Sequence, residues 1–282
     1  MTGTQALSDI SLEDRHPLFG KMIERSGEKS EFDNPPLDAY HEDYFPSFIV
    51  NNIVTPPFKH VREIADAPGY PAGHEVKKGH PVEDIYHRDI TCNRDAFNAA
   101  AKTETADVIA GSEVGFHIFV GTPNKDWDGY NYIFHDGPAQ AYLARAPGDD
   151  LSTFTGYDGQ WFKIASITAA ENTTPNPNYW IVYQKAKIEF SIPTKTPPGK
   201  YLLRMEHFMR GNDYGPPQFY VSCAHINVMG SGGGSLDGYD FAKFPGTYNL
   251  SDPAIMYKVD APYDPMELLN YVGPGPKVWT GE

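Results

Sequence analysis

Alternation between apolar and polar side chains is the main structural signal along this chain. The stretch at residues 218–228 alternates over most of its length, which predicts a strand. Because successive side chains of a strand point to opposite faces, its residues divide into two sets. Gln218, Tyr220 and Ser222 lie on one face, and Phe219, Val221 and Cys223 lie on the other. One face therefore carries a phenol that can contribute to a site, and the other carries a thiol that can link the strand to the core.

Other segments show similar alternation or short apolar runs, separated by turn residues. The further predicted strands are 16–23, 84–92, 105–111, 114–120, 139–144, 161–165, 180–192 and 201–208, with a short apolar piece at 48–50. Residues 99–102 fit a helical turn. Short strands separated by Gly- and Pro-rich turns predict an all-β fold, an antiparallel β-sandwich of the immunoglobulin or fibronectin type with long loops.

Composition supports this fold class and suggests one domain. The chain has 282 residues with 40% hydrophobic content, enough for a sizeable core. The 26 glycines and 25 prolines suit many short strands joined by turns better than a helical bundle. We expect a single β-sandwich over 16–282, preceded by a flexible or unprocessed extension at 1–15. The Gly-rich spacer at 230–234 is too short to separate two domains.

Charge and hydropathy restrict the possible partners. The formal net charge is −14, so nucleic acid is not an expected partner, because phosphate binding requires a basic surface. A neutral polysaccharide is compatible with this charge. No stretch approaches transmembrane length, which argues against a membrane partner. Residues 1–10 lack the apolar run of a signal peptide.

The two cysteines, Cys92 and Cys223, are too few for a structural zinc site. They are either two buried thiols or one disulfide that closes a long loop, and the pattern alone leaves both open. Two glycosylation sequons begin at Asn172 and Asn249, which lends weak support to secretion.

Three motifs carry a resemblance to a known family. His135-Asp-Gly-Pro138 precedes a predicted strand, Gln218-Phe-Tyr220 precedes Cys223, and Pro274-Gly-Pro-Lys-Val-Trp-Thr-Gly281 closes the chain. In this order they resemble the auxiliary activity family 9 lytic polysaccharide monooxygenases, fungal enzymes formerly classed as glycoside hydrolase family 61. The resemblance covers roughly residues 16–281.

This resemblance implies a copper site of the histidine-brace type on a flat face of the sandwich. His135 matches the second histidine ligand, Tyr220 the axial residue, and Gln218 the neighbour that orients the oxygen species. The first histidine ligand uses its own free amino group, and His16 matches that position if the chain is cleaved after Arg15. Amine and imidazole nitrogens suit Cu(II).

The resemblance also implies a Cys92–Cys223 disulfide, an extracellular monomer, a polysaccharide substrate and an external electron donor. The chain departs from the family at two places. The family has a histidine shortly after the segment that corresponds to Arg204-Met-Glu206, but this chain has Arg210 or Gly211 near that place, and His207 is expected to point elsewhere. Where the family has a substrate-stacking tyrosine, this chain has Asp260, with Tyr257 and Tyr263 as possible substitutes.

Three functions follow from these observations. The first is a copper monooxygenase that oxidises cellulose or a related β-glucan. The second is a non-catalytic relative that acts as a copper- or polysaccharide-binding module, which the departures and the internal His16 favour. The third is a glycoside hydrolase with paired carboxylates, but no carboxylate pair stands out. The motifs favour the first function.

Overall fold

The computed structural model describes residues 43–68, 78–119, 132–171, 179–259 and 265–281. The chain divides into two compact units, Met1–Ala39 and Tyr40–Glu282, and all of the described residues belong to the second. The predicted strand at 16–23 and the predicted boundary after residue 15 lie outside the described residues and stay predictions.

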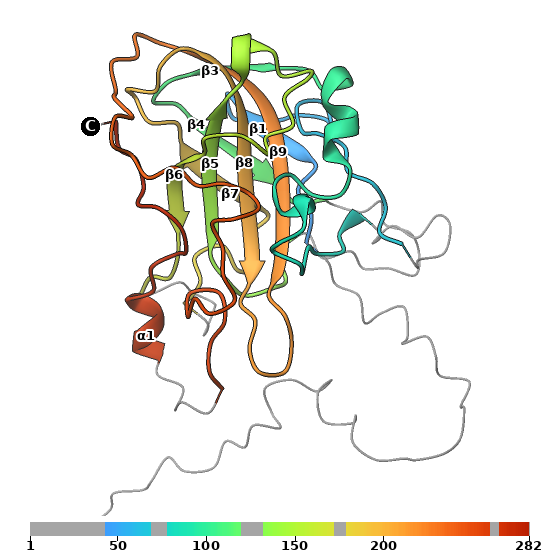
Figure 1. Cartoon of the computed structure of the whole chain (residues 1–282), viewed down its shortest axis with the longest axis vertical. Helices are drawn as coiled ribbons and strands as arrows, with labels where there is room; N and C mark the ends of the chain where they lie inside the picture. Colours follow the sequence, from blue (N-terminus) through green and yellow to red (C-terminus); the bar gives the residue numbers. More distant parts are fainter. Residues whose placement is uncertain (1–42, 69–77, 120–131, 172–178, 260–264, 282) are drawn as a thin grey trace, which may run out of the picture. The chain divides into compact units, whose positions relative to one another are not determined.

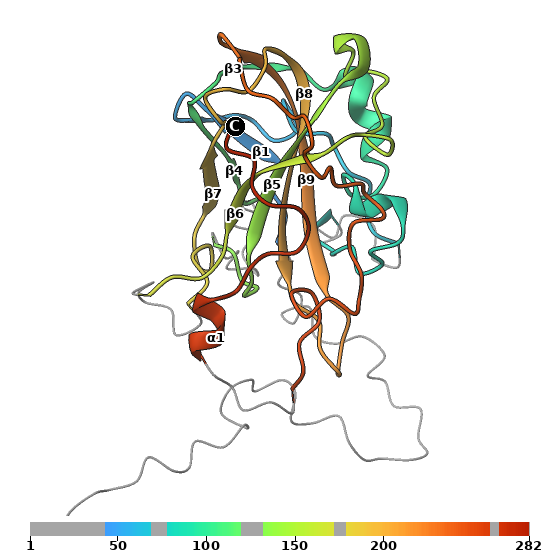
Figure 2. The ribbon, with the colours of Figure 1, turned by 60° about the vertical axis from the view of Figure 1, so that its left-hand side comes forward.

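The described residues form two β-sheets. The first sheet has the order β2-β1-β4-β7 and is antiparallel throughout, with β1 at Ser47–Val50, β2 at Ile53–Val54, β4 at Glu113–His117 and β7 at Lys187–Ser191. The second has the order β3-β9-β8-β5-β6, with β3 at Ala106–Ile109, β9 at Gln218–Met229, β8 at Gly199–Met209, β5 at Ala139–Arg145 and β6 at Phe162–Ile167. Figures 1 and 2 show the two sheets as two layers. The predicted β-sandwich is confirmed, with one parallel pair, β3 and β9.

Both faces of the long strand β9 are buried, and each face packs into a different hydrophobic cluster. Tyr220 and Ala224 belong to the cluster between the two sheets. Phe219 and Val221 belong to a second cluster on the outer side of the sheet. The outer cluster is covered by loops that include the 3-10 helices η4 (Arg88–Ile90) and η5 (Ala96–Lys102). The period-two division predicted for 218–228 therefore separates two cores.

The disulfide Cys92–Cys223 joins β9 to the loop that follows η4. The disulfide implied by the family resemblance is thus present, and the alternative of two free thiols is excluded. It lies on the outer face of β9, away from the phenol of Tyr220.

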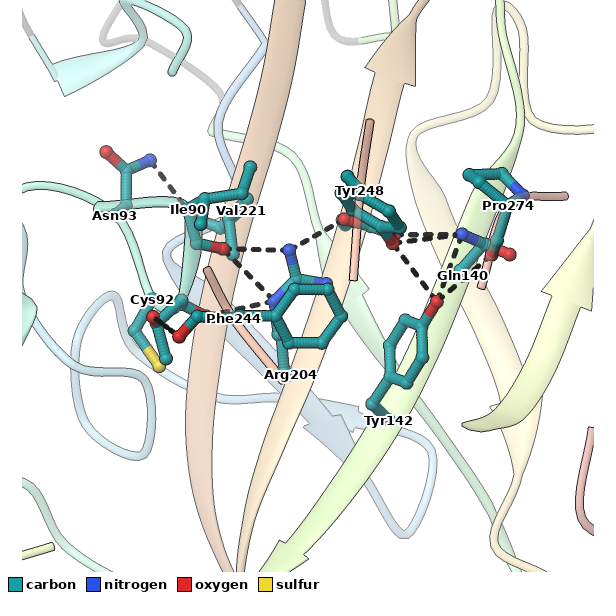
Figure 3. A network of polar contacts seen from close by, with 12 residues as sticks. Ile90, Cys92, Asn93, Gln140, Tyr142, Arg204, Val221, Phe244, Tyr248 and Pro274 are labelled. Atoms are coloured by element: carbon teal, nitrogen blue, oxygen red, sulfur yellow. Dashed lines mark hydrogen bonds and ion pairs between the residues drawn. The ribbon is translucent and has the colours of Figure 1, made fainter. Parts of the chain in front are cut away.

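A buried polar network holds the same loop against β8 (Figure 3). The guanidinium of Arg204 donates to the carbonyl of Ile90 at 2.8 Å and to the carboxylate of Glu206 at 2.7 Å, and its centre lies 3.9 Å from the centroid of the Phe244 ring. Glu206 also accepts a hydrogen bond from Gln140 at 2.9 Å. A buried charge with its partner in contact avoids the large penalty of an unpaired one. The Arg204-Met-Glu206 motif therefore organises the outer layer of the fold.

Two predicted strands are wrong or too long. Residues 84–92 form turns and η4, because the side chains of Asp84 and His87 accept hydrogen bonds from the backbone N–H groups of Tyr86 and Asp89 and curl the chain. The strand predicted at 180–192 is shortened to β7, since Gln184 has a φ of 57° that interrupts the extended backbone.

Helical structure is limited among the described residues. The predicted turn at 99–102 lies within η5, and the short helix α1 at Pro265–Leu269 was not predicted. Within the described part of the chain, no helix combines the length and the apolar character needed to cross a bilayer.

Candidate copper site

Three aromatic rings stack at one end of the second sheet, where β8 ends and β9 begins. The ring of Tyr220 stacks with the rings of both His135 and His207, at centroid distances of 4.9 and 5.9 Å. Tyr220 is on β9, and His207 is its cross-strand partner on β8. His135 lies in the loop just before β5. Because β5 is antiparallel to β8, this loop reaches the same end of the sheet.

The structure brings His135, Tyr220 and Gln218 together. The hydroxyl of Tyr220 lies 3.2 Å from Nε2 of His135 and donates to Oε1 of Gln218 at 3.1 Å. Tyr220 itself is 1% exposed, whereas the side chain of His135 is 13% exposed. An imidazole nitrogen and a phenol oxygen therefore face one point next to solvent. This arrangement suits the predicted ligand pair, whose roles stay predictions.

Asp43 completes this cluster, and the sequence analysis assigned it no role. Its Oδ2 lies 3.0 Å from Nδ1 of His135 and 3.6 Å from Nε2 of His207. Burial raises the pKa of Asp43, but the hydrogen bond from His135 and the charges of the two histidines outweigh this effect, so the pKa lies below its usual value. A single aspartate in a loop gives no sequence signal for such a position.

The prediction that His207 points away from the site is wrong. His207 is fully buried against Tyr220, with Nδ1 3.1 Å from the carbonyl oxygen of Pro138 and Nε2 3.1 Å from that of His135. Burial, its largest influence, lowers the pKa of His207. The pairing register of β8 with β9 places His207 directly opposite Tyr220. That register was the missing information, since period-two counting works only within one strand.

Gly211 is, with Arg210, one of the two positions near which the resemblance leads us to expect a histidine, and no side chain fits at Gly211. A Cβ atom at this position would collide with Sδ of Met256 and would lie 2.6 Å from the backbone nitrogen of Pro217. Gly211 pairs with Met256 in an isolated β-bridge, which brings these two segments of the backbone close together. Packing therefore excludes a histidine at position 211.

Two tyrosines are exposed at the connection between β8 and β9, residues 210–217, or next to it. Tyr257 is 40% exposed; Asn212 donates to its hydroxyl at 2.9 Å, and the guanidinium of Arg210 lies 4.9 Å from its ring centroid. Tyr214, which the sequence analysis did not single out, is 80% exposed. Its backbone N–H donates to the side chain of Asn212 at 2.8 Å, which fixes the turn.

Several predicted residues cannot be placed. His16, Asn172, Asp260 and Tyr263 lie outside the described residues. Among the residues that the structure describes, no three His, Cys, Asp or Glu side chains form a metal-binding group.

The comparisons with known proteins identify the family. The model of Auxiliary Activity family 9 (formerly GH61) matches residues 43–267. The AA9 family lytic polysaccharide monooxygenase U of Thermothielavioides terrestris is 45% identical over 249 residues, which cover 83% of this chain and 90% of the relative. This chain belongs to auxiliary activity family 9. A second AA9 relative, lytic polysaccharide monooxygenase C of Emericella nidulans, is 38% identical over 248 residues, which cover 87% of this chain and 94% of the relative.

Solved structures agree with the AA9 fold. A cellulose-active polysaccharide monooxygenase from M. thermophila aligns with a TM-score of 0.62 and 24% identity, covering 85% of this chain and 100% of that one. The extended catalytic domain of H. jecorina LPMO9A aligns with a TM-score of 0.62 and 24% identity, covering 85% and 91%. The predicted family, fold class and enzyme class are confirmed. Enzymes of this family are copper-dependent polysaccharide monooxygenases.

Proposed function

We propose that this AA9 member is a copper-dependent monooxygenase that oxidatively cleaves cellulose or a related β-glucan. The observation that carries the proposal is the convergence of His135 Nε2 and Tyr220 Oη, with Gln218 hydrogen-bonded to the phenol, at a point next to solvent. A cellulose-active enzyme among the structural neighbours supports the choice of substrate.

The brace needs a second histidine with a free amino group, and the chain offers two candidates. His16, the predicted one, is 27 residues before Asp43, so chain connectivity does not hold it near the site. His41 is only two residues before Asp43 in the sequence. The carboxylate of Asp43 contacts His135. We therefore propose cleavage before His41, with His16 as the alternative.

The side chains present fit a copper ion. Asp43 contacts Nδ1 of His135, so Nε2 is the ring nitrogen that would bind the metal. An imidazole nitrogen, an amine and a second imidazole suit Cu(II), and the phenol of Tyr220 would lie beside the bound ion. Bound copper supplies one-electron chemistry with oxygen or peroxide. Tyr220 and Gln218 shape the space beside that position and hold a hydroxyl proton between them.

Three forms of the protein test this proposal: the full chain, a form that begins at His16 and a form that begins at His41. Each is incubated with cellulose, copper and a reductant, and soluble products are analysed by mass spectrometry. We expect oxidised oligosaccharides from the His41 form and none after His135→Ala. His87→Ala, at an exposed histidine, is the matched control and should remain active. Products from the His16 form alone would reassign the first ligand.

A binding module without oxidative activity is the second candidate, and Gly211 favours it. Loss of an outer partner of a metal site typically lowers affinity or activity by about 10–100-fold. Copper binding and cellulose binding without any oxidised product, in all three forms, would support this second function over the first.

The proposed partners are a neutral glucan and an external electron donor, and the proposed state is an extracellular monomer. The disulfide supports an oxidising compartment. Asn249 is exposed, and its Oδ1 accepts from the backbone N–H and the hydroxyl of Ser251, so it is available for the proposed glycosylation. Asn172 stays a prediction.

A further inference from the structure

Asp43 is a buried carboxylate whose two oxygens are both engaged by the loop that carries His135. Oδ1 accepts from the backbone N–H of Phe134 at 2.9 Å, and Oδ2 accepts from the backbone N–H of His135 at 3.1 Å. Oδ2 also lies 3.0 Å from Nδ1 of the His135 ring. Asp43 is 1% exposed. The two backbone bonds hold the carboxylate in place, and the third contact therefore holds the ring.

This geometry selects one tautomer of His135. An ionised carboxylate only accepts hydrogen bonds, so Nδ1 must carry the proton in the contact with Asp43. The other nitrogen, Nε2, then presents its lone pair. Nε2 is the atom that faces the hydroxyl of Tyr220 at 3.2 Å. Asp43 thus directs the lone pair of Nε2, and not that of Nδ1, toward the hydroxyl of Tyr220.

We propose that Asp43 is the positioning residue of His135, an inference that rests on the proposed function. Asp43 holds the ring in the Nδ1–H tautomer and places a negative charge behind it. That charge makes Nε2 a stronger donor, which favours Cu(II) over Cu(I). Carboxylate partners of metal-bound histidines typically change metal affinity by about 10–100-fold.

The position of Asp43 in the chain adds a second consequence. It is four residues before Ser47, where β1 begins. One side chain therefore links the entry to the first sheet with the loop that carries His135. The nearby His207, whose Nε2 lies 3.6 Å from Oδ2, closes the far side of the carboxylate. Direct metal binding by Asp43 is disfavoured, because it lies on the Nδ1 side of His135, away from Tyr220.

The first test uses the metal-free full chain labelled with nitrogen-15. Long-range proton–nitrogen NMR spectra report the tautomer of each histidine ring, and His135→Gln assigns the His135 signals. We expect the Nδ1–H tautomer in the unsubstituted chain and a shift toward Nε2–H in Asp43→Asn. Asp107→Asn is the matched control, since Asp107 also accepts a side-chain hydrogen bond but lies on β3. An unchanged tautomer in Asp43→Asn would overturn the proposal.

The second test measures copper in the form that begins at His41, which retains both sheets and the disulfide. Asp43→Asn should weaken Cu(II) binding by about 10–100-fold and weaken Cu(I) binding less. Each tenfold difference between the two losses raises the reduction potential by about 59 mV. Equal losses for both oxidation states would contradict the charge effect.

The two tests also separate this inference from the proposed function. Failure of both the His16 form and the His41 form to bind copper would overturn the proposed function, while the tautomer measurement would still decide whether Asp43 orients His135. If Asp43→Asn does not fold, Asp43→Ser provides the same two readouts with a smaller side chain. A merely structural role for Asp43 would lower the thermal unfolding midpoint and leave both the tautomer and the potential unchanged.

Discussion

At the residue scale, the site contains one side chain that the sequence analysis gave no role and lacks one that the family resemblance led us to expect. Asp43 adds a buried carboxylate behind His135. Gly211 stands where a histidine was expected, and Met256 and Pro217 fill the space that a side chain at this position would need. Restoring the histidine by substitution alone is therefore not possible without moving the connection between β8 and β9.

The packing around Gly211 predicts the effect of enlarging it. Gly211→Ala should destabilise the protein by about 1–3 kcal/mol, because its Cβ would lie 2.6 Å from the backbone nitrogen of Pro217. Gly211→His should destabilise it further and should not increase oxidation of cellulose. Urea denaturation measures the first effect and product analysis the second.

Gly215, in the same connection, is the matched control for this series. A Cβ atom at Gly215 would meet no atom within 4 Å, so Gly215→Ala should be nearly neutral. A fully stable Gly211→His variant would show that the connection can move, and the packing argument would then be wrong.

The residues of the site were predictable to different degrees. The family resemblance pointed to Gln218 and Tyr220, counting alternate positions placed them on one face of the strand, and the structure places them in hydrogen-bond contact. His207 and Asp43 did not follow, because their roles depend on the β8–β9 register and on a contact across 92 positions of the chain. Contacts of this kind have no local signal.

At the element scale, strands were predicted well where the whole segment lies in a sheet. The segments 218–228 and 201–208 correspond to β9 and β8. The prediction of a strand at 84–92 was wrong because side chains in this segment form hydrogen bonds with the nearby backbone. The alternation of apolar residues gives no sign of such bonds. The parallel pairing of β3 with β9 also depends on tertiary contacts.

The disulfide is the covalent link between two such elements, and its removal is the test at this scale. Cys92 and Cys223 are 131 positions apart, so the bond restricts a large loop in the unfolded chain. The paired substitution Cys92→Ala and Cys223→Ala should lower the free energy of unfolding by about 2–5 kcal/mol. Denaturant titration measures this loss.

A reducing agent provides the control for that variant. It should shift the unfolding midpoint of the unsubstituted protein toward that of the double variant and leave the double variant unchanged. Equal midpoints for the two proteins under oxidising conditions would show that burial, and not the bond, holds the η4 loop on β9.

At the scale of the whole molecule, one buried arginine ties distant segments to the second sheet. Nε of Arg62 donates to Nε2 of His225 on β9 at 2.8 Å, and Nη2 donates to the carbonyl oxygens of Leu151 and Phe154 at 3.1 and 2.7 Å. Arg62 and His225 are 0% and 1% exposed. Burial lowers the pKa of Arg62 to about 10, so it remains charged at neutral pH.

This contact makes the stability of the whole fold dependent on pH. Burial, together with the charge of Arg62, lowers the pKa of His225 to about 3, whereas an unfolded histidine has a pKa of about 6.5. Between these values the unfolded chain binds a proton that the folded chain does not, so stability falls as the pH falls from about 6.5 toward 3.

The substitution His225→Gln tests this linkage, because it keeps an acceptor for Arg62 and removes the group that binds the proton. On lowering the pH from 6.5 to 4.5, the unsubstituted protein should lose about 2 kcal/mol more than this variant in urea denaturation. His87→Gln, at an exposed histidine, should follow the unsubstituted protein, and parallel pH curves for the protein and His225→Gln would refute the linkage.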